Sequence, residues 1–419
     1  MKQLITPLSE RPYRKLFTAQ VLSDLGNWLD FTAIFALVVY AWELSEIWVA
    51  ALSISIGLPW VVVGPFASVF VDRLSRNKVM YICTGIRIAI AISLIFVPNI
   101  YFLLFLVLLK STCGAIFDPA KQGAIRLTVS EENLAKAVTL SQLSVNSMKV
   151  IGPALGGALI ATFGPNSPFL VIAFGFTIAT LLLIGLPSLK SESTETNTNK
   201  TNRKFWNEFK EGLSHINRNF VLKLAIIGTA IVMFIIFLYD GLLVYLSQNL
   251  GFDEAGFGLM VSAIGLGSVV GSLTVGFIQV WKKHPLLFMS STIIFSGSTV
   301  ILMGIGGMRL VEVPLLLWLV FAFILGAVGA GATIPFGYIL QVQTPSQLIG
   351  RVSSVTQSSQ TFAMLIAPAI GAVLSETIGV GLLVAIAGSM TVLLGLIGLP
   401  IIFKLKQKVI LKENQVESV

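Results

Sequence analysis

Residues 132–164, ENLAKAVTLSQLSVNSMKVIGPALGGALIATFG, are repeated near the end of the chain as residues 346–379, SQLIGRVSSVTQSSQTFAMLIAPAIGAVLSETIG. With a one-residue gap before the prolines, the matched positions are Leu134 and Leu348, Val138 and Val352, Pro153 and Pro368, Ala154 and Ala369, Gly156 and Gly371, Leu159 and Leu374, and Gly164 and Gly379. A repeated segment of this kind predicts a chain built from two related halves.

The composition places both halves in a membrane. Of the 419 residues, 55% are apolar and 11% are charged, and the mean hydropathy is +0.88. A soluble globular chain carries roughly a quarter charged residues, so this composition leaves little room for a soluble fold. Crossing the hydrocarbon core takes about 20 helical residues, and apolar stretches of that length follow one another almost to the end of the chain.

These stretches predict twelve transmembrane helices, six on each side of a polar segment. The expected spans are roughly 16–42, 47–71, 79–97, 100–118, 137–162, 167–187, 221–248, 255–281, 285–306, 311–338, 350–375 and 380–403. The two copies of the repeat then fall on the fifth and the eleventh helices, which therefore correspond to each other. The fold class expected is an all-α polytopic membrane protein with two pseudo-symmetric six-helix bundles.

Basic residues set the expected orientation. With a cytoplasmic N-terminus, most of the 28 Lys and Arg lie in cytoplasmic segments, and Arg309 alone is external. Trp42 and Trp48 then lie at the outer interface, and Trp206 and Trp281 at the inner one, where amphipathic rings are enriched. Both termini are therefore expected in the cytoplasm.

The segment between the halves is polar and rich in Ser, Thr and Asn, which indicates a linker. Aromatic and aliphatic residues then recur at helical spacing from Phe205 to Phe220, so an amphipathic helix is expected there, either on the inner leaflet or packed on its own bundle. The domains expected are 1–187 (first bundle), 188–220 (linker with this helix), 221–403 (second bundle) and 404–419 (cytoplasmic tail).

A charged loop motif, GPFASVFVDRLSRNK at 64–78, lies at the cytoplasmic end of the second span. Asp72 stands among Arg73, Arg76 and Lys78. Such a carboxylate can pair with the arginines or with a helix N-terminus in one state and separate in another, which predicts a cytoplasmic gate. The alternative is an ordinary positive-inside loop with one acid.

A proline–glycine motif, VIGPALGG at 150–157, lies midway along the fifth span. Pro153 removes a backbone donor and bends the helix, while Gly152, Gly156 and Gly157 allow another helix to approach closely. The residues alone thus predict a kink and a packing surface, and they set no direction of transport.

The ionisable residues inside the spans are Asp24, Asp30, Arg87, Lys110, Lys149 and Asp240, and four of them, Asp24, Asp30, Lys110 and Asp240, are the candidate coupling and cavity residues. A charge at membrane depth is costly and usually faces a cavity or a partner. The leading hypothesis pairs Lys110 with Asp24 or Asp30, so that the carboxylate binds a proton according to whether the lysine or the cargo is beside it. The alternative is that these groups merely satisfy one another or snorkel, and Asp240 lies near the outer surface, where water can solvate it.

Catalysis, metal binding and a cofactor are not expected. The sequence has no phosphate-binding loop, no nucleophile arrangement and no metal-ligand spacing, and both cysteines fall inside spans. The net charge is +8, but the basic residues that cause it lie in short loops, so no nucleic-acid partner is expected either. An ion gradient is the energy source that remains.

The loop motif resembles that of the major facilitator superfamily, G-x-L-x-D-R-x-G-R-R/K, with Ser68 and Ser75 in place of two glycines. In the second half, Gln279 stands opposite Asp72. VIGPALGG is similar to the superfamily's antiporter signature G-x-x-x-G-P-x-x-G-G, with Met148 in place of the first glycine. Lys110 stands where the family's fourth-helix motif has an arginine, and that helix lines the central cavity in the family.

The resemblance covers nearly the whole chain and is strongest to the bacterial macrolide-efflux and siderophore-exporter type. It implies a monomeric, proton-coupled exporter of a hydrophobic or amphipathic small molecule, which works by alternating access in the bacterial inner membrane. The partners implied are the cargo, protons and the lipid bilayer. Uptake or facilitated diffusion of a solute or lipid, or a receptor without transport, are the alternatives.

Overall fold

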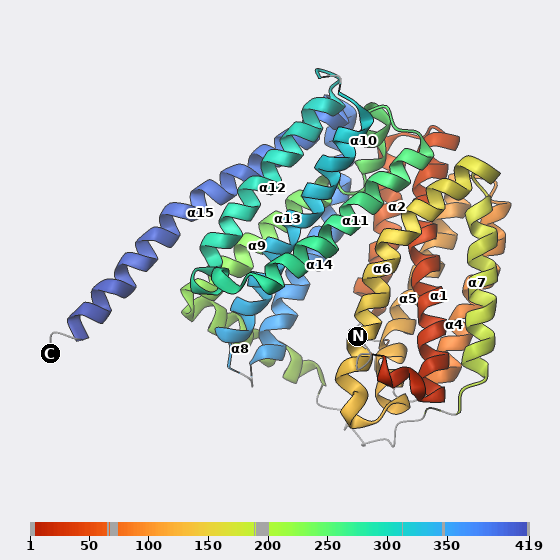
Figure 1. The fold of residues 1–419 in the computed structure, drawn as a ribbon, viewed down its shortest axis with the longest axis horizontal. Coiled ribbons are helices and arrows are strands. Elements are labelled where there is room, and N and C mark those ends of the chain that lie inside the picture. Colours follow the sequence, from red (N-terminus) through yellow and green to blue (C-terminus); the bar gives the residue numbers. More distant parts are fainter. Residues whose placement is uncertain are drawn as a thin grey trace. The chain divides into compact units, whose positions relative to one another are not determined.

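The computed structural model describes residues 5–64, 67, 74–187, 189, 201–311, 313–345 and 348–416, with the backbone alone for Ala135, 201–209 and 401–416. Within these ranges every regular element is a helix (Figure 1). Internal contacts divide the chain into two units, Met1–Asn197 with Gly251–Ser262, and Thr198–Leu250 with Ala263–Val419.

The first unit contains a short 3₁₀ turn, Thr6–Ser9, and six long helices. They are α1 (Arg11–Ala36, continued by a π-helical turn at Leu37–Ala41), α2 (Glu46–Val62), α4 (Arg76–Ile95), α5 (Ile100–Thr128), α6 (Glu131–Phe163) and α7 (Ser167–Ile184). The first residues of α11 also belong to this unit. In this unit α1 packs beside α6 and α7, α4 packs beside α5 and α7, and α2 packs beside α5.

The second unit begins with α8 (Thr201–Arg218). Its other elements are α9 (Phe220–Tyr239), α10 (Leu243–Asn249), most of α11 (Glu254–Phe277), the 3₁₀ turn Gln279–Lys283, α12 (Pro285–Gly307), α13 (Leu315–Val342), α14 (Ile349–Ile378) and α15 (Val380–Val416). Here α12 lies beside α15 and α13, and α9 lies beside α14.

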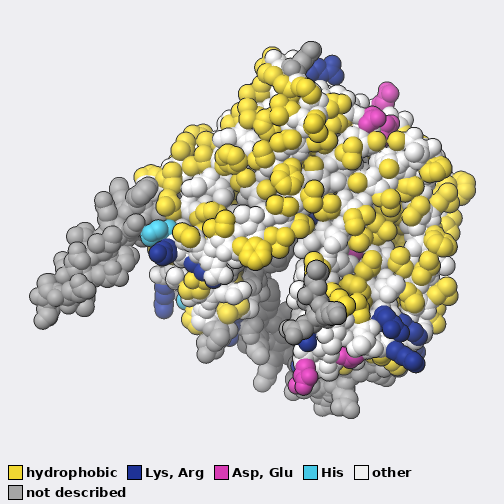
Figure 2. Space-filling model, viewed as in Figure 1, with side chains coloured by type: hydrophobic (Ala, Val, Ile, Leu, Met, Phe, Trp, Pro, Cys, Tyr) yellow, Lys and Arg dark blue, Asp and Glu magenta, His cyan; other side chains and the backbone are white. Residues whose placement is uncertain are grey.

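Eleven of the described helices are long and apolar enough to cross a membrane. Another apolar helix, α2, has 17 described residues and begins the second expected span. Large apolar side chains cover much of the outer surface (Figure 2), and Phe96, Phe163 and Phe277 are each more than three-quarters exposed. So much exposed apolar surface suits lipid rather than water, and the all-α polytopic fold expected from the sequence is confirmed.

The repeated segments form matching helix pairs. In the first unit α6 runs parallel to α1, because the contacts Gln20–Ser141, Asp24–Ser144 and Thr32–Gly156 advance together along both helices. In the second unit α14 packs on α9 in the same direction. Buried Val352 joins Leu222 at one end, and Gly371 meets the Leu238 backbone at the other. Each repeated helix thus packs on the first span of its own unit.

Several helix boundaries differ from the expected spans: α6 begins at Glu131 rather than 137, and α15 continues to Val416 rather than 403. The span predicted at 100–118 is part of a longer helix, because α5 continues through polar residues to Thr128. The span predicted at 221–248 is broken: α9 ends at Tyr239, a turn follows at Asp240–Leu242, and α10 begins at Leu243. Gly241 in this turn lowers helix propensity, and apolar periodicity does not register such a break.

The described second half of α8 packs on the second unit. Glu211 forms an ion pair with Arg351 of α14. The His215 Nε2 atom lies 3.0 Å from the Gln343 carbonyl oxygen, and Ile216 is buried in the apolar cluster of α9, α12, α13 and α14. For these residues, the contacts are those of a helix packed on its own bundle.

Candidate functional site

The first unit has a partly open cavity of about 270 Å³ between four helices. Its lining residues are Asn27, Trp28, Asp30, Phe31, Ile34 and Phe35 from α1, Ile56 and Trp60 from α2, Arg87 from α4, and Lys110, Ser111 and Gly114 from α5. An apolar cavity with a few converging polar groups is the usual form of a small-molecule site.

An aromatic wall on α1 forms one side of this cavity. Trp28, Phe31 and Phe35 recur at helical spacing, so their rings lie on one face. The ring centroids of Trp28 and Phe31 are 5.9 Å apart, and those of Phe31 and Phe35 are 4.6 Å apart. Trp60 of α2 adds a further ring to the lining, so the cavity is suited to a flat or amphipathic apolar body.

An ion pair between Asp30 and Lys110 crosses the cavity from α1 to α5. The Asp30 side chain is 3% exposed and that of Lys110 is 15% exposed. Of the two carboxylates expected as partners of Lys110, the one that pairs with it in the structure is therefore Asp30 and not Asp24. Because both charges are removed from water, the loss of one partner leaves the other uncompensated, at a cost of about 3–5 kcal/mol.

Asp24 lies in a separate hydrogen-bond network between α1 and α6. The Ser144 hydroxyl donates to the Asp24 Oδ2 atom at 2.7 Å, and the Gln20 amide donates to the same oxygen at 3.2 Å. Gln20 in turn accepts from Ser141 at 2.9 Å. All four side chains are buried. The two α1 carboxylates therefore have different partners: neutral donors hold Asp24, and a cation holds Asp30.

Arg87 is a lining residue that sequence reasoning left out of the site. The α4 side chain is 4% exposed, and its guanidinium carbon lies 5.5 Å from the ring centroid of Phe117 and 5.6 Å from that of Phe176. Periodicity on α4 could not assign Arg87 to the cavity, because the direction in which α4 faces depends on its packing against α5 and α7. The only available signal was the cost of an arginine at membrane depth.

Lys149 of α6 is not a lining residue of the cavity. Its Nζ atom lies 5.6 Å from the ring centroid of Trp28, which does line the cavity. A cation over an indole face is attracted by the ring quadrupole. Lys149 is therefore placed behind the aromatic wall rather than in the cavity itself.

The proline–glycine motif packs α6 against two other helices. Gly152 lies against Trp28, and Gly156 lies against Leu29 and Thr32 of α1. On another side, Gly157 lies close to the Ala255 backbone at the start of α11, while Gly258 of α11 lies against the Pro153 carbonyl oxygen. The Ser262 hydroxyl donates to the Val150 carbonyl oxygen at 2.6 Å. The motif thus provides close helix approaches inside the first unit.

The loop motif is described only in part. Asp72 and Arg73 lie outside the described residues. The Arg76 Nη1 atom donates to the Gly123 carbonyl oxygen of α5 at 2.9 Å, and Lys78 is exposed. The gate assigned to these four residues stays a prediction, with Arg76 joining α4 to α5.

Asp240 belongs to the second unit, whereas the other candidates for coupling belong to the first. It caps the C-terminal end of α9 in the second unit, its side chain is exposed, and it is not a lining residue of the cavity described above. The structure therefore brings together Asp30 and Lys110 and places Asp24 on the same helix with other partners, while Asp240 belongs to the other unit.

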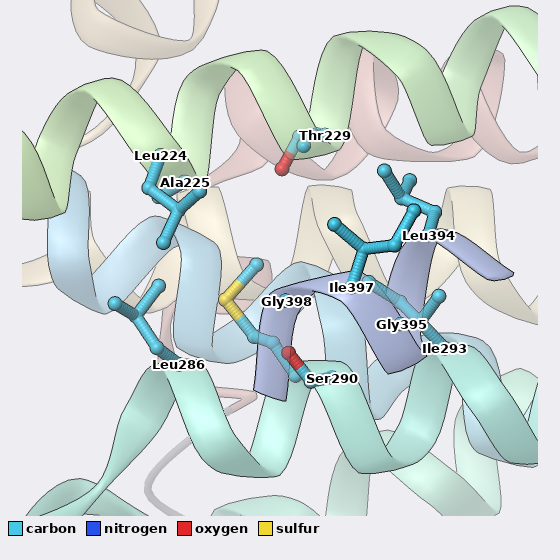
Figure 3. Close-up of a pocket in the computed structure, with 12 residues that line it drawn as sticks. Leu224, Ala225, Thr229, Leu286, Ser290, Ile293, Leu394, Gly395, Ile397 and Gly398 are labelled. Carbon is cyan, nitrogen blue, oxygen red and sulfur yellow. The ribbon is translucent and has the colours of Figure 1, made fainter. Parts of the chain in front are cut away.

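The second unit has an apolar cavity of about 100 Å³ between α9, α12 and α15 (Figure 3). Its lining residues are Leu224, Ala225, Gly228, Thr229, Leu286, Met289, Ser290, Ile293, Leu394, Gly395, Ile397 and Gly398. The hydroxyls of Thr229 and Ser290 are its side-chain polar groups, and no lining residue is charged. Among the described residues, the lining of this cavity therefore offers no carboxylate or amine that could exchange a proton.

Comparison with known proteins supports a transport role. A family model described as transmembrane secretion effector, a branch of the major facilitator superfamily (MFS), matches residues 3–417. The uncharacterised MFS-type transporter YfiS of Bacillus subtilis (strain 168) is 30% identical over 92% of this chain and 91% of its own length. Macrolide efflux protein A of Streptococcus pyogenes is 25% identical over 81% of this chain and 84% of its own length. The enterobactin exporter EntS of Citrobacter koseri is 27% identical over 82% of this chain and 80% of its own length.

Solved structures share the fold. The crystal structure of the nucleoside transporter NupG superimposes with a TM-score of 0.75 over 93% of this chain and 99% of that one, at 12% sequence identity. At that identity the likeness concerns the fold alone, and function has to be argued from the site.

Proposed function

Because the chain belongs to the transmembrane secretion effector family of the major facilitator superfamily, we propose that it exports a hydrophobic or amphipathic small molecule in exchange for protons. The family and its relatives are membrane transporters and not enzymes, and several relatives are named as exporters. These names concern chemically different cargoes, so they favour export without selecting a cargo.

The buried Asp30–Lys110 pair in an aromatic cavity is the observation that carries this proposal. Protonation of Asp30 removes its negative charge, and with it the attraction that holds Lys110 across the cavity. Lys110 is then free to leave the carboxylate, and the cavity can rearrange. Cargo in the aromatic pocket and a proton on Asp30 thus compete through one ion pair, which is the coupling that antiport requires.

Alternating access is the transport cycle that we propose for the two six-helix halves. The small-residue contacts of α6 with α1 and α11 allow close, shape-dependent packing that two discrete arrangements can use. Arg76, with Asp72, Arg73 and Lys78, would act at the cytoplasmic end. We further propose a bacterial inner-membrane location with both termini in the cytoplasm, and a monomeric working unit.

Transport in inside-out membrane vesicles tests the proposal. A fluorescent amphipathic dye should accumulate in vesicles containing the wild-type chain only when the lumen is acidified, and D30N and K110M should abolish this accumulation. D118N is the matched control, because Asp118 also pairs with a lysine on α5, Lys121 at 2.8 Å, but does not line the cavity. Dye movement independent of the proton gradient would contradict antiport, and uptake in right-side-out vesicles would favour import.

A further inference from the structure

The cavity of the first unit contains one more cation than it can pair. Lys110 is neutralised by Asp30, the only acid among the described residues that line the cavity. Arg87 lines the same cavity at 4% exposure, and among the described residues no carboxylate forms an ion pair with it. The nearby α1 carboxylate of Asp24 is engaged by Ser144 and Gln20 instead. The lining therefore has a surplus positive charge.

The guanidinium of Arg87 is also short of hydrogen-bond acceptors. Its Nε and Nη1 atoms are buried and have no hydrogen-bond partner in the described part of the chain. The rings of Phe117 and Phe176 flank the group, and they offer cation–π attraction but no lone pairs. Buried donors in native proteins almost always have an acceptor, so an unsatisfied guanidinium indicates a partner that comes from outside the protein.

Gly114 leaves space for this guanidinium at the cavity wall. A Cβ atom on Gly114 would lie 2.8 Å from the Arg87 Nη2 atom and 3.4 Å from the ring of Trp60. The cation and an aromatic ring thus meet at one point of the lining. Lys149, over the Trp28 ring, adds positive charge behind the aromatic wall of α1. A molecule that joins an aromatic body to an anionic group matches both features.

We propose that the cavity recognises cargo carrying a carboxylate next to an aromatic or similar apolar body, with the Arg87 guanidinium as the partner of the carboxylate. Charge-assisted hydrogen bonds from a guanidinium to a carboxylate are among the strongest in proteins, and they would satisfy the donors left open on α4. The inference rests on the proposed export function, because it names the cargo class of the same cavity.

Equilibrium binding to the purified full-length protein in lipid nanodiscs tests this assignment. The probes are 2-naphthoate and its neutral analogue 2-naphthamide, titrated by calorimetry near neutral pH against empty nanodiscs as the blank. The wild type should bind the carboxylate about tenfold more tightly than the amide, as a charge-assisted hydrogen bond allows. R87Q should reduce this ratio to about one, and R126Q, which removes an exposed arginine of α5, should leave it unchanged.

A second variant covers the case in which R87Q does not fold. G114A keeps the charge of Arg87 but places a methyl group against its Nη2 atom, so the preference for the carboxylate should fall while the amide still binds. Equal affinity of the wild type for both probes, absence of naphthoate binding at millimolar concentration, or a preference that survives in R87Q and G114A would each overturn the assignment and leave Arg87 with a purely structural role.

The binding test is independent of the transport test, because it uses no gradient. A carboxylate preference that depends on Arg87, together with transport that ignores the proton gradient, would keep the anion site and overturn proton coupling. Gradient-driven transport by a protein that binds both probes equally would keep proton coupling and overturn the anion site.

Discussion

Lys110 on α5 forms an ion pair with Asp30 on α1, whereas Asp24, less than two helical turns earlier on α1, is held by the Ser144 hydroxyl of α6. One helix thus presents two buried carboxylates to two different neighbours. A change in the charge of Asp30 acts on the contact between α1 and α5, and a change in the charge of Asp24 acts on the contact between α1 and α6. The two acids are therefore separable by mutation.

The first prediction concerns the stability of the ion pair. D30N or K110M alone leaves one buried charge without a partner and should destabilise the first unit by about 3–5 kcal/mol. The double variant D30N/K110M removes both charges and should recover most of that loss, although its transport should stay abolished. Thermal unfolding in detergent, combined with the vesicle assay, measures both effects. Equal melting temperatures for the single and double variants would show that the pair is not energetically coupled.

The second prediction concerns the Asp24 network. S144A removes the shorter of the two hydrogen bonds to Asp24 and leaves a buried carboxylate under-satisfied, so stability should fall by about 1–3 kcal/mol. Thermal unfolding again gives the measurement. S298A is the control, because the Ser298 hydroxyl is exposed and donates only to the Ile294 carbonyl oxygen of its own helix. A loss for S298A as large as that for S144A would remove the support for the network.

The third prediction uses Glu10, which lies before α1. Its carboxylate accepts from the Asn133 amide at 3.0 Å and from the Ser130 backbone and hydroxyl, at the N-terminal end of α6. The Asn133 hydrogen bond is the largest cause of a pKa below the ordinary value of a glutamate. Because the folded-state pKa is the lower one, this contact stabilises the protein above the ordinary pKa of about 4.3 and is lost as pH falls through the lowered value.

Thermal unfolding measured at falling pH should accordingly show a small acid-dependent loss in the wild type that is weaker in E10Q, since a neutral amide does not titrate. The effect is expected to be small, because Glu10 is only partly buried and solvent screens its carboxylate. Identical pH profiles for the two proteins would mean that the contact contributes nothing to stability.

The fold was readable from the sequence because its signals are local. Apolar length and the repeated segments predict the spans and the two halves, and lipid allows few other ways to satisfy the backbone. The turn at Asp240–Leu242 and the extension of α5 to Thr128 were not predicted, since a single glycine and a polar helix end change the mean hydropathy of a window very little.

The candidate site could be predicted only in part from the sequence, because its geometry depends on which way each helix faces. The cost of charge in a membrane selected Asp30 and Lys110, and packing then decided that Lys110 meets Asp30 and not Asp24. Arg87 carried the same signal but was not assigned to the cavity. Its placement depends on Phe117, Phe176 and Gly114, which belong to two other helices and have no fixed spacing from it in the sequence.

The last prediction separates two glycines that the repeat aligns. A Cβ atom on Gly156 would lie 3.4 Å from the Thr32 Cβ, an ordinary contact, whereas one on Gly371 would collide with the Leu238 carbonyl oxygen, which the helix geometry of α9 holds in place. G156A should therefore keep its melting temperature to within a degree or so, and G371A should lose about 1–3 kcal/mol, as overpacked sites do. Thermal unfolding of G156A, G371A and the wild type measures these two changes in stability. Equal losses would mean that α9 and α14 separate as easily as α1 and α6, and that the two halves tolerate the same change despite their different helix contacts.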